Sequence, residues 1–327
     1  MIHGGNVWEG GRPGAWLDFS ANLRPEGPPQ WAMDAMEKAL DCVRYYPDRA
    51  MRDARAGLAA YAGVREENIL PTCGGIAAID LAMSLGSGPV RVERVTFGEY
   101  ATRARAHGRA VVFCDEPCRA GDTMVLCNPN NPTGFARSRE EIKSLFDRAR
   151  AENWSLVVDE AFIDYCPECS ARDMACEGLT IVGSLTKILG VPGVRLGYVC
   201  GPAEAIAKME AAALPWQLNA LAAALAGEVP RHMDEMRRDA EMNTQRREAF
   251  SLALHNLGAR VLPSRANFLL CDFGRDMTAA VQALKDKGIL VRTCASFGLS
   301  PAHIRLAVKT EEENQRLTGE LERCLRS

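Results

Sequence analysis

The chain has 327 residues, with 39 lysine and arginine residues against 42 aspartate and glutamate residues, so its net charge is only -3 at pH 7. This near balance gives no basic field for nucleic acid or for an anionic membrane surface. No apolar run is long enough to span a membrane, and the first residues lack the pattern of a secretory signal. We therefore expect a cytoplasmic protein without nucleic-acid or membrane partners, long enough to form two subdomains.

The sequence contains 12 cysteines, scattered along its length. Only Cys166 and Cys169 form a C-x-x-C pair, and no second pair follows at the spacing of a zinc site. Several of the others lie in apolar, strand-like runs, where a free thiol behaves as a small apolar side chain. We therefore expect reduced, buried thiols in preference to a metal site.

The first third of the chain predicts an arm, two helices and a strand–turn–helix unit. Residues 1–29 are rich in glycine and proline and predict an irregular arm that packs against another part of the protein. Helical periodicity follows over 30–42 and over 52–61. Residues 68–80 then predict a strand, a Gly-Gly turn and an apolar helix, and backbone N–H groups at such a helix start can approach an anion.

Apolar, strand-like runs then alternate with helical segments. The predicted strands cover 91–97, 110–114, 123–127, 155–158, 180–183 and 196–200. They lack strict polar alternation, as expected of strands that are covered on both faces. This order predicts an α/β protein with a mostly parallel sheet. Ligands of such sheets bind where strands end, and residues 128–133, Asp159 and residues 184–187 follow three of these strands.

The last third predicts a smaller α+β domain. A helical stretch over 203–227 is interrupted near Pro215, and a long helix follows over 233–257. The remaining strands are predicted near 261 and over 267–272, 290–293 and 304–308, with helices over 277–287 and 311–325. The predicted domains are an N-terminal arm at 1–29 that joins the small domain, a large domain at 30–225 and a small domain at 226–327.

The run from Ser184 to Gly197 places Lys187 among small, apolar and hydroxyl residues. A buried ammonium is costly, so such a lysine has a lowered pKa and can form a Schiff base. Ser184, Thr186 and Arg195 offer two hydroxyls and a guanidinium to a phosphate. A lysine and a phosphate site are what pyridoxal 5'-phosphate (PLP) requires. By itself, the run is equally consistent with a helix-capping segment followed by a Gly/Pro turn.

PLP also needs contacts to its ring, and three residues could supply them. Asp159 ends a strand and could face the pyridine nitrogen, Asn131 could donate to the ring 3'-oxygen, and Tyr100 could cover the ring. Each residue has a simpler explanation as well. These are a solvated acid at a strand end, a Pro/Asn/Gly turn and an ordinary half-buried aromatic side chain.

The motifs Asn128-Pro-Asn-Asn-Pro-Thr-Gly134, Asp159-Glu-Ala-Phe162 and Ser184-Leu-Thr-Lys187 occur in the order and spacing of a known family. The chain resembles the fold-type-I PLP enzymes of the histidinol-phosphate aminotransferase group, and within it the phosphothreonine decarboxylase branch. Segments that resemble this branch are His3-Gly-Gly-Asn6, Asp18-Phe-Ser-Ala-Asn22, Asp159-Glu-Ala-Phe-Ile-Asp164, Pro215-Trp-Gln-Leu-Asn-Ala220, Arg265-Ala-Asn-Phe-Leu-Leu270 and Ile289-Leu-Val-Arg-Thr-Cys-Ala295. The resemblance implies PLP fold type I, with a mostly parallel mixed sheet.

The resemblance also implies roles for individual residues. Those that contact the PLP ring would be Lys187, Asp159, Asn131 and Tyr100. Those that hold its phosphate would be Ser184, Arg195, the amides of Gly74 and Gly75 and, across the interface of a homodimer, Tyr46. Those that bind substrate would be Asn22, Arg305 for the carboxylate, and His3 and Arg292 for the substrate phosphate.

The activity implied by the resemblance is decarboxylation of L-threonine O-3-phosphate to 1-amino-2-propanol O-phosphate, for the cobamide nucleotide loop. L-Serine O-phosphate could also serve, because its missing methyl is worth only about 1 kcal/mol. The alternative is an aminotransferase acting on histidinol phosphate or a related amine. Phe162 favours the decarboxylase branch, since these aminotransferases usually carry tyrosine there. The intact Lys187, Asp159 and Arg195 argue against a mere binding or regulatory module.

Two segments depart from the family pattern. The run Thr72-Cys-Gly-Gly-Ile-Ala-Ala78 stands where the family usually has Gly-Asn-Gly-x-Thr-Glu, so side-chain donors to the phosphate are lost while backbone donors remain. Arg24 stands where an asparagine is usual. Both departures lie close to predicted binding residues, so they bear on the substrate pocket and on cofactor affinity.

Overall fold

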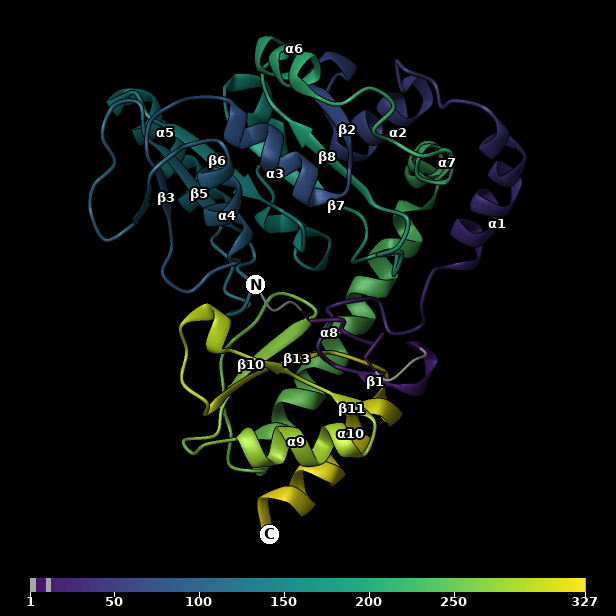
Figure 1. Ribbon diagram of the computed structural model, residues 1–327, viewed down its shortest axis with the longest axis vertical. Coiled ribbons are helices and arrows are strands. Elements are labelled where there is room, and N and C mark those ends of the chain that lie inside the picture. The colour runs from purple at the N-terminus through teal and green to yellow at the C-terminus, as the bar shows by residue number, and fades with distance from the viewer. Residues whose placement is uncertain (1–3, 10–12, 327) are drawn as a thin grey trace.

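The computed structural model describes residues 4–9 and 13–326, which form two lobes, one above the other in Figure 1. The upper lobe contains a large sheet with helices around it, and the lower lobe contains a smaller sheet with helices packed against it. Helix α8 (Met233–Asn256) runs from one lobe into the other. The two lobes therefore share one long helix.

The larger sheet has seven strands in the spatial order β2-β8-β7-β6-β5-β3-β4. In that order they are β2 (Ile69–Cys73), β8 (Leu196–Cys200), β7 (Thr180–Ser184), β6 (Ser155–Asp159), β5 (Thr123–Cys127), β3 (Val90–Val92) and β4 (Val111–Phe113). Strand β8 is antiparallel to β2 and β7, and the other neighbouring pairs are parallel. The predicted α/β class with a mostly parallel mixed sheet is confirmed.

One strand of this sheet is shorter than predicted. The run over 91–97 predicts a strand throughout, but β3 ends at Val92. Beyond Val92, side-chain hydrogen bonds replace the backbone hydrogen bonds between neighbouring strands. Thr96 Oγ1 donates to Asn130 Oδ1 at 2.7 Å, and Asn130 Nδ2 donates to the carbonyl of Val95 at 2.9 Å. The chain after β3 is thereby tied to the loop after β5 and leaves the sheet.

Helices pack around the larger sheet. They are α1 (Gln30–Ala39), α2 (Arg52–Ala62), α3 (Gly75–Ser84), α4 (Glu99–Ala106), α5 (Arg139–Glu152), α6 (Ala203–Ala212) and α7 (Ala220–Glu228). A capping box begins α5, because Ser138 Oγ accepts from the Glu141 N–H and the Glu141 carboxylate accepts from the Ser138 N–H. The break between α6 and α7 lies at the predicted Pro215.

The lower lobe is built on an antiparallel sheet in the order β12-β13-β10-β9. Its strands and helices are β9 (Arg260–Val261), β10 (Phe268–Asp272), β12 (Arg292–Thr293), β13 (His303–Ala307), α9 (Thr278–Asp286) and α10 (Glu311–Arg326). Strand β1 (Leu17–Asp18) pairs in parallel with β11 (Ile289–Leu290), so the N-terminal segment lies against this lobe. The domain limits at 29 and 225 stay a prediction.

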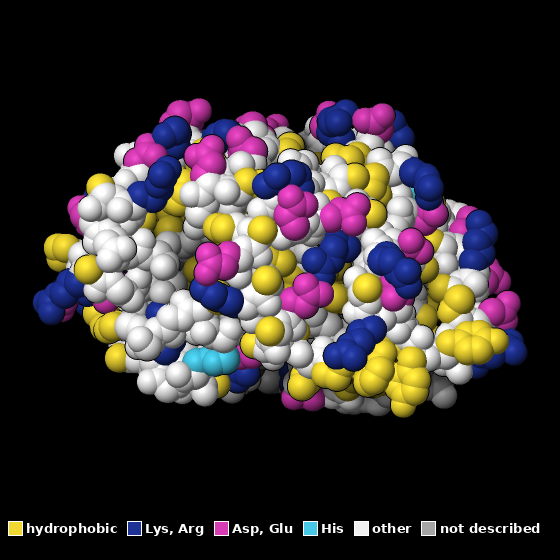
Figure 2. Space-filling view, turned by 90° about the horizontal axis from the view of Figure 1, so that it is seen from above, with side chains coloured by type: hydrophobic (Ala, Val, Ile, Leu, Met, Phe, Trp, Pro, Cys, Tyr) yellow, Lys and Arg dark blue, Asp and Glu magenta, His cyan; other side chains and the backbone are white. Residues whose placement is uncertain are grey.

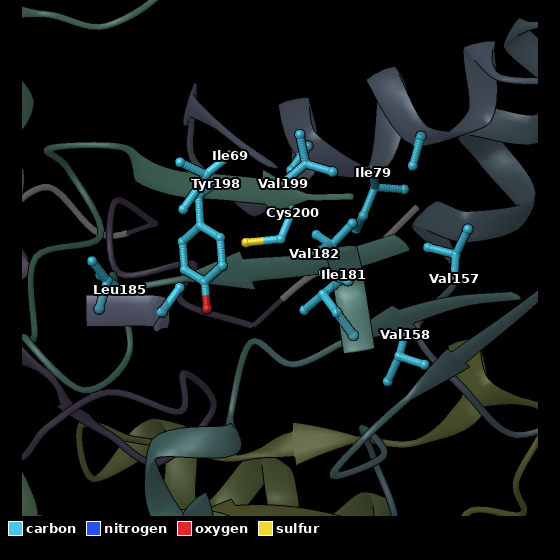
Figure 3. Packing of buried hydrophobic residues seen from close by; sticks show 14 of the residues in the cluster. Ile69, Ile79, Val157, Val158, Ile181, Val182, Leu185, Tyr198, Val199 and Cys200 are labelled. Carbon is cyan, nitrogen blue, oxygen red and sulfur yellow. The ribbon is translucent and has the colours of Figure 1, made fainter. Parts of the chain in front are cut away.

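Short 3-10 helices connect several of these elements. They cover Pro13–Ala15, Leu40–Arg44, Glu66–Asn68, Ile163–Tyr165, Pro167–Cys169, Arg172–Glu177, Val229–His232 and Ala295–Phe297. Each lobe has its own apolar core, and Figure 3 shows part of the larger one, with Ile181 and Val182 of β7 beside Val199 of β8. Full burial of such a side chain contributes about 1.5–3 kcal/mol.

The surface carries both signs of charge. Figure 2 shows the upper end of the molecule, where lysine and arginine side chains lie among aspartate and glutamate side chains. This mixture agrees with a net charge of only -3. Among the described residues, no helix is long and apolar enough to cross a bilayer.

Two glycines of the larger sheet permit unusually close packing. A Cβ atom on Gly183 of β7 would lie 2.1 Å from the ring of Tyr198. A Cβ atom on Gly197 of β8 would lie 2.5 Å from the carbonyl carbon of Gly74 and 2.6 Å from the nitrogen of Gly75. Strand β8 therefore packs directly against the backbone at the start of α3.

We predict that Gly197→Ala lowers the free energy of unfolding by about 1–3 kcal/mol, as overpacking does elsewhere. The cause is that the new methyl group meets backbone atoms, which cannot rotate away. Urea denaturation measures the effect. Gly193→Ala is the matched control, because no described atom lies within 4 Å of a Cβ built there. Equal urea midpoints for Gly197→Ala and Gly193→Ala would contradict the close packing of Gly197 against the backbone of Gly74 and Gly75.

Candidate active site

A cavity of about 500 Å³ lies where β5, β6 and β7 end, and it gathers most of the predicted site residues. The predicted residues that line it are Asn22, Gly75, Tyr100, Asn131, Asp159, Ser184, Lys187, Arg195, Arg292 and Arg305. Residues from both lobes line it, because Arg292 and Arg305 belong to β12 and β13. The cavity therefore lies between the two lobes, at the edge where α/β sheets bind their ligands.

Lys187 follows β7 and lines this cavity. Burial lowers its pKa from 10.5 to about 8, and the nearby charges of Arg195 and Arg305 act in the same direction. Asp159 acts in the opposite direction. Lys187 is therefore neutral in a larger share of molecules than an exposed lysine is, and the neutral amine is the nucleophilic form.

Asp159 is a buried carboxylate at the end of β6. Its Oδ2 accepts a hydrogen bond from the Tyr100 hydroxyl at 2.6 Å, and its Oδ1 accepts one from the backbone N–H of Ala161 at 2.9 Å. Desolvation raises the pKa of Asp159, while the two donors and the charge of Lys187 oppose that rise. The contacts thus hold the carboxylate in one orientation and favour its charged form.

Tyr100 makes a contact that the sequence did not predict. It is fully buried and its hydroxyl is committed to Asp159, so it positions that carboxylate. Phe97 also lines the cavity, and its ring lies edge-on to that of Tyr100 with centroids 5.6 Å apart. The stacking of Tyr100 on a cofactor ring stays a prediction, and Phe97 is a second aromatic candidate for it.

Arg305 links the lower lobe to two loops of the site. Its Nη1 donates to Asn131 Oδ1 at 2.5 Å, and its Nη2 donates to the carbonyl of Ser20 at 2.6 Å. Burial, together with the charge of Arg292, lowers the pKa of Arg305 to about 9. Because Asn131 accepts through its oxygen, its amide nitrogen remains available as a donor.

Arg292 and Arg305 are neighbours in the cavity wall. Arg292 Nη2 donates to Ser296 Oγ at 2.6 Å. The guanidinium carbons of Arg292 and Arg305 lie 5.2 and 6.0 Å from the ring centroid of Phe297, within range of cation–π attraction. The two hydrogen bonds from Arg305 go to neutral oxygens, the side-chain oxygen of Asn131 and the carbonyl of Ser20. This part of the cavity is therefore suited to an anionic ligand.

The predicted phosphate site combines main-chain and side-chain groups. Helix α3 begins at Gly75, and Gly74 before it has φ +78°. A Cβ atom on Gly74 would lie 2.5 Å from Arg195 Nη2, so the guanidinium packs onto the glycine. The hydroxyls of Ser184 and Thr186 lie 2.8 Å apart. A helix start, two hydroxyls and a guanidinium form a suitable site for a phosphate.

Tyr46, among the predicted residues that the structure describes, is placed apart from the cavity. It is 81% exposed and packs against Trp216 with ring centroids 4.8 Å apart. His3 lies outside the described residues. Asn22 lines the cavity, and its Oδ1 is buried without a hydrogen-bond partner among the described residues. Asn22 is therefore available to a donor on a ligand.

Sequence reasoning missed several residues of the cavity wall. They are Ser20, Phe97, Ser296, Phe297 and Cys127. Phe97 had a weak signal, since it ends a predicted strand and lies three residues before Tyr100. Phe297 and the Ser20 carbonyl had none, because their positions depend on how the lower lobe and the N-terminal segment pack over the larger sheet.

The residues that are present fit PLP. Lys187 supplies an amine with a lowered pKa, and Asp159 supplies an oriented carboxylate. The start of α3, with Ser184 and Arg195, supplies an anion site whose cradle would be blocked by a Cβ atom on Gly74. These are the three contacts that the cofactor requires from a protein.

Comparison with known proteins supports this fit. The family model described as aminotransferase class I and II matches residues 15–321. The chain is 33% identical to the threonine-phosphate decarboxylase of Salmonella typhimurium, over 99% of this chain and 96% of that protein. It is 31% identical to the histidinol-phosphate aminotransferase of Hyphomonas neptunium, over 95% and 91%. The structure of L-threonine-O-3-phosphate decarboxylase from Porphyromonas gingivalis aligns with a TM-score of 0.86 at 26% identity, covering 94% and 98% of the two chains.

We predict that borohydride fixes PLP covalently to the protein and that Lys187→Ala abolishes this attachment. Mass spectrometry of the reduced protein measures it. In the natural chain, attachment should accelerate as the pH rises through about 8, because the neutral amine reacts. Lys143→Ala is a control, since Lys143 pairs with Asp147 on the surface of α5. PLP fixed to another lysine in Lys187→Ala would contradict the assignment.

Proposed function

The chain belongs to the class I and II aminotransferase family of PLP enzymes, and from that membership we propose that it decarboxylates L-threonine O-3-phosphate. The product is 1-amino-2-propanol O-phosphate, for use in the cobamide nucleotide loop. The observation that carries the proposal is the pair Arg292 and Arg305 in one cavity wall. Phosphothreonine offers a carboxylate and a phosphate together, whereas histidinol phosphate offers only a phosphate.

When bound, PLP supplies an electron-accepting ring that stabilises the carbanion left by loss of CO2. The protein's own residues then have separate tasks. Asp159, held by Tyr100 and by the N–H of Ala161, would offer a negative charge to the cofactor's pyridine nitrogen. Lys187 would hold the cofactor through Nζ and would deliver a proton from that atom to the substrate Cα.

The reaction is chosen by the orientation of the substrate. The way in which the protein holds the substrate would decide which bond at Cα the cofactor activates. Arg305 holds the carboxylate and Arg292 the phosphate, and two fixed anions leave little freedom of rotation about Cα. This preference is worth a few kcal/mol. Phe162, which lines the cavity without a hydroxyl, withholds the donor that a tyrosine would give to the ring 3'-oxygen.

The working enzyme is proposed to be a homodimer. Exposed apolar side chains gather on and near Leu40–Arg44 and beside the break between α6 and α7. They are Leu40, Val43, Tyr45, Tyr46, Leu214 and Trp216. An apolar patch of this kind is typical of a permanent interface. In such a dimer, Tyr46 would contact the cofactor phosphate in the neighbouring subunit.

An aminotransferase acting on histidinol phosphate is the second candidate. It is favoured by the likeness to the Hyphomonas neptunium histidinol-phosphate aminotransferase. Both activities use the same lysine, carboxylate and phosphate site. They differ in the bond broken and in the need for a keto acid, so product analysis separates them.

We expect the holoenzyme to release CO2 from L-threonine O-3-phosphate without a keto acid. L-Serine O-phosphate should react less efficiently, by about fivefold for one missing methyl at 1 kcal/mol. Products are identified by mass spectrometry. Histidinol phosphate with 2-oxoglutarate is the comparison. Turnover of that pair, with no turnover of phosphothreonine, would establish the aminotransferase and overturn the leading proposal.

We predict that Tyr100→Phe lowers kcat/KM roughly tenfold, the value of one hydrogen bond to a charged group. Loss of this donor raises the pKa of Asp159, because the hydroxyl opposes the effect of burial. The variant should therefore lose activity at a higher pH than the natural enzyme as the solution is acidified. Tyr61→Phe is the control, since buried Tyr61 donates to Asp164 away from the cavity. If Tyr100→Phe loses activity at the same acidic pH as the natural enzyme, Tyr100 does not lower the pKa of Asp159.

A further inference from the structure

The N-terminal segment from Ser20 to Gly27 touches both ends of the candidate active site. At one end, the carbonyl of Ser20 accepts from Arg305 Nη2 at 2.6 Å. At the other end, the backbone N–H of Arg24 donates to the carbonyl of Lys187 at 3.1 Å. Asn22, between them, lines the cavity. The position of this short segment therefore affects the lysine, the arginine and the cavity wall together.

The same segment packs tightly against the turn that carries Lys187. Gly190 has φ +62°, and a Cβ atom there would lie 2.9 Å from the carbonyl carbon of Gly27. The N–H of Gly190 and the N–H of Arg24 both donate to the Lys187 carbonyl, at 3.3 and 3.1 Å. A shift of the segment would therefore be transmitted directly to the backbone of Lys187.

One side chain fastens this segment to the rest of the protein. Arg24 Nε donates to Asp239 Oδ2 at 2.8 Å, and its Nη2 donates to Asp239 Oδ1 at 3.3 Å. Its Nη1 donates to the carbonyl of Gly27 at 2.7 Å, which closes the segment on itself. The side chains of Arg24 and Asp239 are only 12% and 13% exposed. A two-pronged pair so well shielded from water is stronger than an exposed ion pair.

Asp239 belongs to α8, the helix that runs between the two lobes. A second pair, from Arg246 to Glu26 at 2.5 Å, lies two turns further along α8 but is more exposed, at 21% and 34%. Arg24 is thus the better shielded anchor of the segment. The contacts of its side chain lie outside the cavity, so the guanidinium acts on the site only through the residues that it holds in place.

We propose that Arg24, through its pair with Asp239, is a positioning residue that holds Lys187, Asn22 and Arg305 in register around the cavity. One ion pair outside the cavity would thus fix the positions of Lys187 and of the side chains that face the substrate. Small misplacements of such groups are costly, since an error of 1 Å can reduce a rate by about a hundredfold. The kinetic part of the test rests on the proposed function, whereas the cofactor part does not.

The test compares Arg24→Gln, Asp239→Asn and the double variant with the natural holoenzyme. We expect each single variant to raise KM for phosphothreonine about tenfold and to release PLP several-fold faster on dilution. The double variant should be no worse than Arg24→Gln, because the pair between Arg24 and Asp239 is already lost in that single variant. Arg24→Lys, which keeps the charge and one donor, should recover most of the lost affinity.

Arg55→Gln is the matched control. Arg55 pairs with Glu210 at 2.6 Å and is 15% exposed, but it lies away from the cavity. It should lower the melting temperature by less than Arg24→Gln does, because Glu210 is 42% exposed, and it should leave KM and PLP release unchanged.

Two results would overturn the proposal. One is a lowered melting temperature in Arg24→Gln with natural KM and PLP release, which would make the pair merely structural. The other is additive effects in the double variant. If the natural enzyme does not turn over phosphothreonine, the proposed function fails, but PLP release still decides the role of Arg24.

Discussion

The burial of Lys187 and Asp159 away from water determines the chemistry of this site. Lys187 and Asp159 line the same cavity, and burial pushes each toward its neutral form. Their mutual attraction opposes that push, and so do the donors that Tyr100 and Ala161 direct at the carboxylate. The balance leaves a lysine that readily loses its proton beside a carboxylate that is held in one orientation. Neither property would survive in an open, hydrated cleft.

The larger sheet creates this arrangement by its topology. Parallel strands β5, β6 and β7 end at one edge, so Asn131, Asp159 and Lys187 meet although they are far apart in the chain. Their order along the chain and the apolar strands before them are visible in the sequence. For that reason the α/β class, the cofactor and the cluster around Lys187 could be predicted before the structure was known.

Other features depend on packing that no local pattern reveals. The sequence does not show that β3 ends at Val92, because side-chain bonds from Thr96 and Asn130 replace the ladder there. It does not show that the hydroxyl of Tyr100 reaches Asp159. Phe297 and the carbonyl of Ser20 enter the cavity wall only after the lower lobe has packed over the sheet. Arg24 and Asp239 are 215 positions apart in the sequence, and no sequence pattern indicates that they form an ion pair.

The pairing of β1 with β11 has a consequence for biosynthesis. The N-terminal segment is made first, yet Leu17 pairs with Ile289 and the Ser20 carbonyl binds Arg305. During translation the larger sheet can form while the segment still has no partner, because domains tend to fold as they emerge from the ribosome. The cavity is completed only after Arg305 has left the ribosome. A ribosome-bound fragment that ends at α8 should therefore hold a folded sheet and an unfinished site.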